Sequence, residues 1–384
     1  MGFINSNDFY NTLSKEHKVL DSYATLNFAH NNHQIYKCNL EKAQTKVDAI
    51  NLFPSYLSST FNDAERVNIK TIPQKKIVGY GINIKGNQDF ETFFKNEFSK
   101  SFRSNTRRFV NRLEACFNTN YKMFFGNINK VDYDFLMSAL HTMLTNRFNQ
   151  REESNKMLKN WDYYLESVYK NINSKKASLF VIYHDEKPIQ ISLNYHFDKI
   201  LFISIPSYNI DYAKFSLGNI SIYKILDWAV TNSYEIMDLE YGYLEYKRRW
   251  SNYIYEFNHH VIYSKNNIKA TLLASVEILK LKLKNLLKSL NIDKLVKNLK
   301  GYFYKQKTTH IAIAYKTEFI DFINTNNLET LNINSPQLIN LKKIIFDFLF
   351  VNKTHISDLK IYEIEPLKEY VFCGKTKSQK IIIT

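Results

Sequence analysis

The residues best suited to chemistry lie within 207–250, where a strand is followed by a loop and by a helix that opens at Ser216-Leu217-Gly218. The first amides of a helix lack partners inside the helix and lie at the positive end of its dipole. We therefore expect an anion site at this turn, with the amides of Asn219 and Ile220 unsatisfied unless an acceptor binds them. In the alternative interpretation, Ser216 only caps the helix and Gly218 only relieves crowding.

Two carboxylates follow on the next predicted strand. Asp238 and Glu240 are two residues apart, and Met237 and Leu239 alternate with them. Because side chains alternate along a strand, both carboxylates are expected on one face, where a cleft could expose them. A carboxylate whose pKa is raised by partial burial can act as a general base. The alternative for Asp238 is a structural role as a hydrogen-bond acceptor.

A basic helix face precedes this region. The segment 90–117 repeats Phe and Leu with a helical period, and its other face carries arginines in a chain that otherwise prefers lysine. Guanidinium groups match the geometry of phosphate, so this face is predicted to hold a phosphate-bearing acceptor. A solvated charged surface is the alternative. The basic residues are Lys100, Arg103, Arg107, Arg108 and Arg112.

Several other kinds of site find no support. The histidines at 30, 33, 259 and 260 lack further ligands at zinc spacing, so no metal is expected. The sequence has no P-loop, dinucleotide fingerprint or nucleophile elbow. Its three cysteines are far apart, and neither a secretory signal nor a run of about 18 apolar residues is present. A cytoplasmic protein is therefore expected.

The elements that must position these side chains alternate irregularly. Strands are predicted at 34–40, 66–72, 76–84, 121–127, 177–184, 187–197, 199–206, 234–240 and 253–263, and helices at 6–20, 90–117, 132–149, 155–172 and 218–232. The order is neither a βαβ repeat nor an all-β pattern. It predicts an α+β domain in layers.

Positive charge is concentrated near the end of this region. The net charge is +15, and residues 264–307 contain 11 Lys against Glu277 and Asp293. Leucines recur at steps of three and four from Leu272 to Leu290, which predicts one long helix or two shorter ones over 268–299. This amphipathic segment is expected to pack on the protein's own core or on a second copy, or else to lie on an anionic membrane.

The order and spacing of these motifs, from about residue 90 to 264, resemble the GNAT acyltransferase superfamily. The similarity is to its branch of cellulose-biosynthesis-type (CelD-like) acetyltransferases, which are related to the FemAB transferases. It is carried by the basic helix face at 100–112, by Tyr208, Tyr212, Lys214, Ser216 and Gly218, and by Asp238, Gly242, Tyr246, Lys247 and Trp250. The resemblance implies a GNAT-like mixed sheet flanked by helices, in two tandem units, with a helical C-terminal extension.

The resemblance also implies a role for each group of residues. Acetyl-coenzyme A or another acyl-coenzyme A would be the donor, and its pyrophosphate would be held by Ser207, Tyr208, Lys214, Ser216, Gly218, Asn219 and Ile220. Lys247, beside Tyr246, would stabilise the oxyanion that forms at the thioester, unless 247–249 is only a solvated basic turn. Glu240 or Asp238 would take the proton of the attacking amine. Arg103, Arg107, Arg108 and Trp250 would hold the acceptor, an amino sugar or another envelope or polysaccharide precursor.

Four segments are expected along the chain. They are a degenerate GNAT-like unit at 1–128, an acyltransferase unit at 129–264, the Lys-rich helical segment at 265–307 and a small α/β tail at 308–384. The alternatives to an acyl-coenzyme A transferase are a FemAB-like transferase that uses aminoacyl-tRNA, and a non-catalytic module on the same scaffold that binds nucleic acid or membrane. The Lys-rich segment would let a cytoplasmic enzyme reach the inner face of the membrane or form a homodimer.

Overall fold

A computed structural model describes residues 4–38, 47–84, 89–151, 156–290, 315–320, 328–366 and 368–383. The chain forms two compact units, and each is assembled from segments that are distant in sequence. Unit 1 contains residues 1–88, 194–204 and 229–307, and unit 2 contains residues 89–193, 205–228 and 308–384. The predicted Lys-rich segment is thus described only as far as residue 290.

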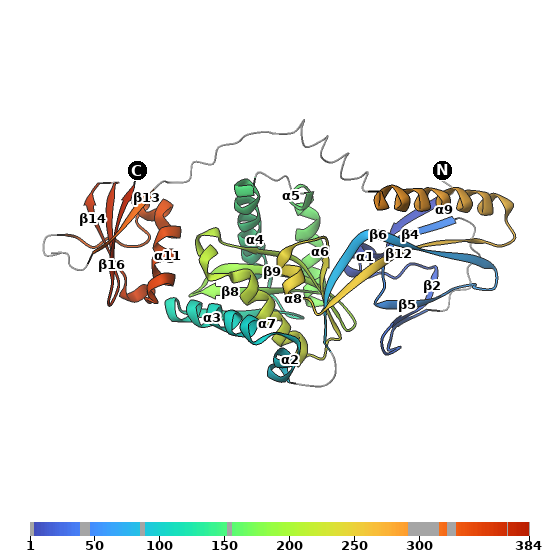
Figure 1. The fold of residues 1–384 in the computed structure, drawn as a ribbon, viewed down its shortest axis with the longest axis horizontal. Coiled ribbons are helices and arrows are strands. Elements are labelled where there is room, and N and C mark those ends of the chain that lie inside the picture. The colour runs from blue at the N-terminus through green and yellow to red at the C-terminus, as the bar shows by residue number, and fades with distance from the viewer. Residues whose placement is uncertain are drawn as a thin grey trace, which may run out of the picture. The chain divides into compact units, whose positions relative to one another are not determined.

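Unit 1 is built mainly of strands (Figure 1). Its elements are β1 (Ile4–Asp8), α1 (Phe9–Ser14), β2 (Tyr23–Phe28), β3 (Gln34–Lys37), β4 (Val47–Pro54), β5 (Leu57–Phe61), β6 (Val67–Asn83), β11 (Ile236–Tyr241), α8 (Glu245–Trp250), β12 (Tyr253–Ser264) and α9 (Ile268–Ser289). The strands β3, β2 and β5 form a separate antiparallel sheet. Helix α9 runs along β4, β6 and β12 (Figure 1).

Unit 2 carries most of the helices. Its elements are α2 (Phe90–Glu97), α3 (Lys100–Cys116), β7 (Thr119–Phe124), α4 (Lys130–Arg151), α5 (Lys156–Lys159), α6 (Trp161–Asn173), β8 (Ala177–His184), the 3-10 helix η1 (Ile210–Phe215), β13 (Tyr315–Ile320), α11 (Lys342–Asn352), β14 (Lys360–Glu365), β15 (Glu369–Cys373) and β16 (Ser378–Ile383). Helix α11 packs on η1 and α3. The last four strands form their own antiparallel sheet, in the order β13-β16-β15-β14.

Three elements contribute residues to both units: β9 (Lys187–Phe197), β10 (Ile200–Tyr208) and α7 (Leu217–Thr231). The main sheet is mixed and has the order β1-β4-β12-β6-β11-β10-β9-β8-β7. Strands β8 and β9 are buried along almost their whole length, as expected for strands covered on both faces. The predicted α+β class, with a mixed sheet flanked by helices, is confirmed.

Some element boundaries differ from the predictions for local reasons. The predicted helix 90–117 is two helices, because two side chains cap a helix start. Asp89 accepts a hydrogen bond from the amide of Thr92, and Ser99 accepts one from the amide of Phe102. The predicted helix 6–20 is only α1, because β1 occupies the residues before its cap at Asp8. The two strands predicted at 66–72 and 76–84 form the single strand β6, and 155–172 contains both α5 and α6.

Buried histidines make the stability of unit 1 depend on pH. Burial lowers the pKa of His196 to about 3 and the pKa values of His259 and His260 to about 4. These rings stay neutral in the folded state, whereas the unfolded chain takes up their protons near pH 6.5. Asp238 acts in the opposite sense. Burial raises its pKa to about 6, so as the pH falls this carboxylate takes up its proton in the folded state before it does so in the unfolded state. Below pH 6 the unfolded state therefore binds up to two more protons than the folded state.

We expect the free energy of unfolding to fall by roughly 2–3 kcal/mol per pH unit between pH 6 and pH 5. Urea unfolding followed across this range measures the slope. His260→Gln should reduce the slope by about one proton, or roughly 1.4 kcal/mol per pH unit. Gln34→Ala, at an exposed residue of unit 1 that does not titrate, is the control and should leave the slope unchanged. A flat profile in the unmodified protein would contradict this account.

Candidate functional site

The predicted pair of carboxylates lies at an irregular end of β11. This strand pairs in parallel with β10 from Ile236 opposite Ile200 to Asp238 opposite Phe202. Its antiparallel register with β6 shifts between Asp238 and Tyr241, and Glu240 has a left-handed φ of 64°. Left-handed backbone is strained for a residue other than glycine and often marks a functional site. The regular alternation predicted for Asp238 and Glu240 is therefore interrupted.

Asp238 is fully buried and is held by hydrogen bonds on both oxygens. Tyr56 Oη donates to Oδ2 at 2.9 Å, and Tyr255 Oη lies 2.7 and 2.8 Å from the two carboxylate oxygens. The backbone amide of Glu240 donates to Oδ1 at 2.7 Å. Burial raises the pKa of Asp238 to about 6, although these hydrogen bonds oppose the rise. This geometry favours the structural role for Asp238, in which its side chain fixes the left-handed turn at Glu240.

Glu240 and Lys247 form the charged centre of this cluster. Burial raises the pKa of the Glu240 carboxyl, while Lys15, Lys247 and a hydrogen bond with Ser204 counteract it. Lys247 is only 6% exposed, and its Nζ donates to the Tyr241 carbonyl at 3.0 Å. Burial lowers the pKa of its ammonium group, and the carboxylates of Glu240 and Asp238 counteract that shift. The Lys247 ammonium can stabilise a negative charge that develops on a substrate, and the Glu240 carboxylate can accept a proton. This pair is therefore suited to acyl transfer chemistry.

The other residues predicted in 246–250 have different surroundings. Arg248 and Arg249 are exposed, so the interpretation as a solvated basic turn fits them and is wrong for Lys247. Tyr246 is half-buried. Trp250 is fully buried, which favours a packing role in the core over the predicted contact with an acceptor.

Sequence reasoning missed the residues that complete this cluster. Tyr10 and Lys15 lie in and directly after α1, and Tyr56, Ser204 and Tyr255 come from three other segments of unit 1 that are far apart along the chain. One signal was available in the sequence, namely a glycine inside β6 at position 79. A Cβ there would lie 2.0 Å from Cζ of Tyr255, so Gly79 makes room for this ring.

The turn before α7 differs from the prediction in its hydrogen bonds. Ser216 has a left-handed φ of 59°. Its carbonyl oxygen accepts hydrogen bonds from the backbone amides of Asn219, at 2.9 Å, and Ile220, at 3.2 Å. The prediction that these two amides are unsatisfied is therefore wrong. Asn219 Nδ2 also donates to Ser216 Oγ at 2.7 Å. The amides that precede them in the helix, those of Leu217 and Gly218, make no hydrogen bond with any residue that the structure describes.

Gly218 has open space around it. A Cβ at this position would meet no atom of the described residues outside its own helix backbone and chain neighbours within 4 Å. The alternative explanation, that Gly218 relieves crowding within the protein, is therefore wrong. Packing inside the protein therefore does not require glycine at this position. The space that its missing side chain leaves can hold a group from outside the chain.

The remaining residues predicted to hold the donor also lie in unit 2. Ser207 is buried, and within the described ranges its Oγ has no hydrogen-bond partner. Arg147 Cζ lies 5.1 Å from the ring centre of Tyr208. Lys214 forms an ion pair with Asp347 of α11 at 3.6 Å. The structure thus groups residues 207–220 in one unit and residues 238–250 in the other.

The predicted arginine face lines a groove of about 750 Å³ along α3. Of the residues that the structure describes, six cations and no carboxylate line it; these lining residues are Lys100, Arg103, Ser104, Arg107, Arg108, Asn111, Arg112, Ala115 and Lys353. Arg103 donates to the carbonyls of Lys95 and Phe98, and Arg107 pairs with Glu91. Lys100, Arg108 and Lys353 make no ion pair with the described residues. The groove is therefore suited to a polyanion.

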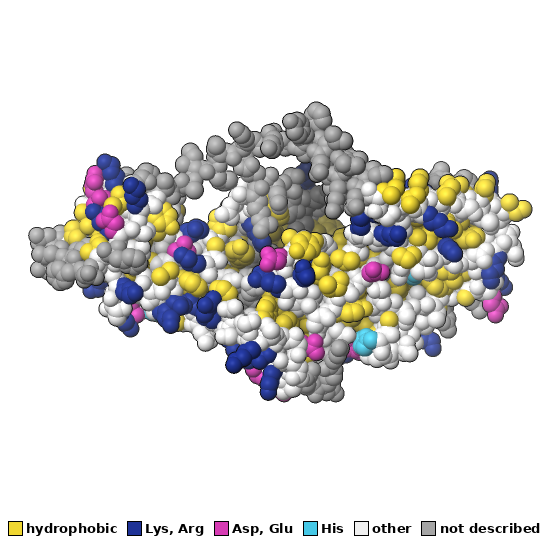
Figure 2. Space-filling view, viewed as in Figure 1, with side chains coloured by type: hydrophobic (Ala, Val, Ile, Leu, Met, Phe, Trp, Pro, Cys, Tyr) yellow, Lys and Arg dark blue, Asp and Glu magenta, His cyan; other side chains and the backbone are white. Residues whose placement is uncertain are grey.

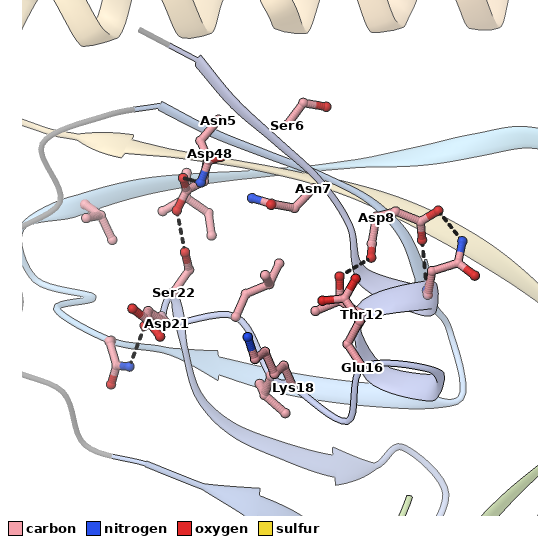
Figure 3. A pocket seen from close by; sticks show the side chains of 16 residues that line it. Asn5, Ser6, Asn7, Asp8, Thr12, Glu16, Lys18, Asp21, Ser22 and Asp48 are labelled. Atoms are coloured by element: carbon pink, nitrogen blue, oxygen red, sulfur yellow. Dashed lines mark hydrogen bonds between the residues drawn. The ribbon is translucent and has the colours of Figure 1, made fainter. Parts of the chain in front are cut away.

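A second hollow, of about 670 Å³, lies in unit 1 beside β1 and α1 (Figure 3). Its walls are polar and carry the carboxylates of Asp8, Glu16, Asp21 and Asp48. Asp48 already accepts hydrogen bonds from Ser22 at 2.5 Å and from Asn5 at 3.1 Å. None of the residues predicted to take part in chemistry lines this hollow.

Two further properties concern metals and membranes. In the ranges that the structure describes, no cluster of three or more His, Cys, Asp or Glu side chains is arranged to hold a metal ion. The helices of the described chain include none that is long and apolar enough to cross a membrane.

Comparison with known structures finds distant similarities. A conserved protein of unknown function from Bacteroides thetaiotaomicron is 11% identical, with a TM-score of 0.39 over 56% of this chain and 70% of that one. The C-terminal domain of a putative lysylphosphatidylglycerol synthetase from Agrobacterium fabrum is also 11% identical, with a TM-score of 0.37 over 59% and 71% of the two chains. FemX is 11% identical, with a TM-score of 0.28 over 51% and 64%. No curated protein matches the chain.

Comparison with protein families gives a more specific result. Residues 100–248 match the model of the acetyltransferase (GNAT) domain. The matched segment runs from the first turn of α3 to α8, so it includes the turn before α7, Glu240 and Lys247. The CelD-like branch is a finer distinction and stays a prediction. Residues 100–248, less than half of the chain, are thus similar to a GNAT-type acetyltransferase domain.

Proposed function

We propose that this protein transfers an acyl group, acetyl in the simplest case, from acyl-coenzyme A to an amine. The observation that carries the proposal is the match of residues 100–248 to the GNAT acetyltransferase domain. Two features inside the matched segment support it. They are the buried cation at Lys247 beside Glu240, and a helix start at Gly218 that leaves open space.

The start of α7 is suited to the pyrophosphate of the donor. The amides of Leu217 and Gly218 lie in the first turn, where the helix dipole favours an anion. Lys214 lies in η1 immediately before this turn and would add a positive charge. Its ion pair with Asp347 is partly exposed, so a phosphate can compete for the ammonium group.

The reaction follows from what the charged cluster can do. The amine attacks the thioester carbonyl directly, a C–N bond forms, and negative charge develops on the carbonyl oxygen. The ammonium of Lys247 stabilises this charge, since a cation in a buried site interacts more strongly than one in water. Glu240, whose pKa burial raises, accepts the proton of the amine. The C–S bond then breaks, and the coenzyme A thiolate leaves and takes up a proton.

The basic groove along α3 supports a phosphate-bearing acceptor. Its cations come from one helix face and from Lys353, which directly follows α11, and Glu91 pairs with one of them, Arg107. An amino sugar attached to a phosphate or diphosphate, as in precursors of envelope polysaccharides, combines an amine with the anion that this groove is suited to bind.

Gly218 offers a test of the donor site that is separate from stability. Gly218→Ala should leave the protein as stable as before or more stable by up to about 1 kcal/mol, because alanine favours helices and its Cβ meets no protein atom. The same Cβ would occupy space next to the bound pyrophosphate. We therefore expect the affinity for acetyl-coenzyme A to fall about tenfold, which corresponds to about 1.4 kcal/mol, in a calorimetric titration.

Gly81→Ala provides the matched control. A Cβ at Gly81 makes only ordinary contacts, at 3.8 Å or more, so this variant should bind acetyl-coenzyme A as the unmodified protein does. Equal affinities of the Gly218→Ala variant and the unmodified protein would show that the donor does not bind at the start of α7.

A further inference from the structure

Helix α9 is held to unit 1 by only one of its faces. Ala270, Ala274 and Leu281 are buried, and they pack in one cluster with Val47, Ile72 and Val261 of the sheet. Small alanines bring the helix close to the strands. Asn285 Nδ2 fixes the far end by donating to the Pro73 carbonyl at 2.7 Å. The other face is then free to contact something else.

That other face is a continuous row of large apolar side chains. Leu272, Val276, Leu279, Leu283, Leu286 and Leu290 are each between 53% and 68% exposed. A helix advances by about 100° per residue, so these positions fall in one arc, directly opposite the alanines that face the sheet. Figure 2 shows hydrophobic side chains gathered over α9. Contiguous exposed apolar patches often mark an interaction site.

The charges around this row are mostly positive. Lys280 and Lys282 border it on opposite sides, according to the same helical spacing. The acidic residue of the helix, Glu277, lies outside the row, and its side chain is 15% exposed and paired with Lys280 at 3.2 Å. An apolar stripe with lysines on both borders and no carboxylate within it is complementary to an anionic lipid surface.

We propose that the leucine row of α9 docks the protein on an anionic bilayer. The helix lies in the plane of the interface, with the row among the acyl chains and the lysines at the headgroup phosphates. A second copy of the chain is a poorer partner for this face, because pairing two such rows brings lysines of like charge together. This inference does not rest on the proposed acyl transfer.

Cosedimentation with vesicles tests the proposal. The full chain should bind vesicles of phosphatidylglycerol with phosphatidylcholine at low salt, and should bind phosphatidylcholine alone much more weakly. Leu279→Ser with Leu283→Ser should reduce binding at least tenfold. Lys280→Gln with Lys282→Gln should reduce it about fivefold per lysine and flatten its dependence on salt. Ile339→Ser, at a position 56% exposed outside α9, is the matched control and should bind normally.

Three results would overturn the proposal. The first is no binding of the unmodified protein to the anionic vesicles at low salt. The second is binding that the Leu279→Ser and Leu283→Ser changes leave intact. The third is a dimer in sedimentation equilibrium that these changes dissociate, because the face would then join two copies. The leucines are exposed, so the variants should keep the thermal midpoint of the parent, which circular dichroism checks.

Discussion

Replacing Lys247 by Met is expected to lower the rate of acetyl transfer by about 10²–10³-fold, the effect of removing one stabilising group from an oxyanion. Methionine keeps an apolar stem of similar length in the buried site, so the protein should stay folded. The change removes the cation next to Glu240, so the pKa of that carboxyl should rise further. The rate is measured as release of the coenzyme A thiol from acetyl-coenzyme A, with a panel of amino sugars and primary amines as acceptors.

The neighbouring Arg248 supplies the control for this change. Its side chain is exposed and belongs to the same short helix, α8. Arg248→Met should therefore keep the turnover of the parent. If Lys247→Met also keeps normal turnover, the buried ammonium has no part in the reaction, and the role proposed for it is wrong.

Asp238→Ala is expected to cause the largest loss of stability, about 3–5 kcal/mol. It removes the acceptor of two buried tyrosine hydroxyls and of the Glu240 amide, so three donors lose the partner that they have at Asp238. Asp238→Asn keeps one acceptor oxygen and should cost about half as much. Urea unfolding at neutral pH measures both values.

A matched surface change separates this effect from a general loss of charge. Asp134→Ala removes an exposed carboxylate that pairs with Lys130 at 2.6 Å, and should cost less than about 1 kcal/mol. If Asp238→Asn instead leaves stability unchanged and abolishes turnover at every pH, Asp238 would be the general base. The role as a positioning residue for Glu240 would then be wrong.

Local features of the fold could be predicted from the sequence because the residues that cause them are neighbours along the chain. The amphipathic period of 100–116 and the alternation of 253–263 are visible in a short window, and both elements are present. The break at Ser99 was missed because the apolar period continues through it, although Ser99 is a good helix cap. At Ser216 the sequence does not reveal the left-handed backbone, which turns the carbonyl toward the amides of Asn219 and Ile220.

The candidate site was predictable only in the part that lies on one strand and the helix after it. The segment Lys247-Arg248-Arg249 reads as a charged surface, and only the packing of α8 on β6 separates the buried lysine from two exposed arginines. Tyr255 lies on β12, which pairs with β6, the neighbour of β11, and Tyr56 lies in the turn after β4, which also pairs with β12. Both residues therefore reach Asp238 through strands that pair over long sequence distances. Such pairing depends on register across the sheet, which no local window contains.

Calorimetric titration of the full chain with acetyl-coenzyme A is the most direct test of the proposed function, with tRNA titrated in parallel. The account predicts saturable binding of acetyl-coenzyme A with one site per chain and a matching rise in the thermal midpoint. It also predicts that tRNA binds weakly, if at all, once salt screens the positive surface. Salt-sensitive binding of tRNA, together with no heat and no stabilisation from acetyl-coenzyme A, would contradict the account and would favour a transferase that uses aminoacyl-tRNA.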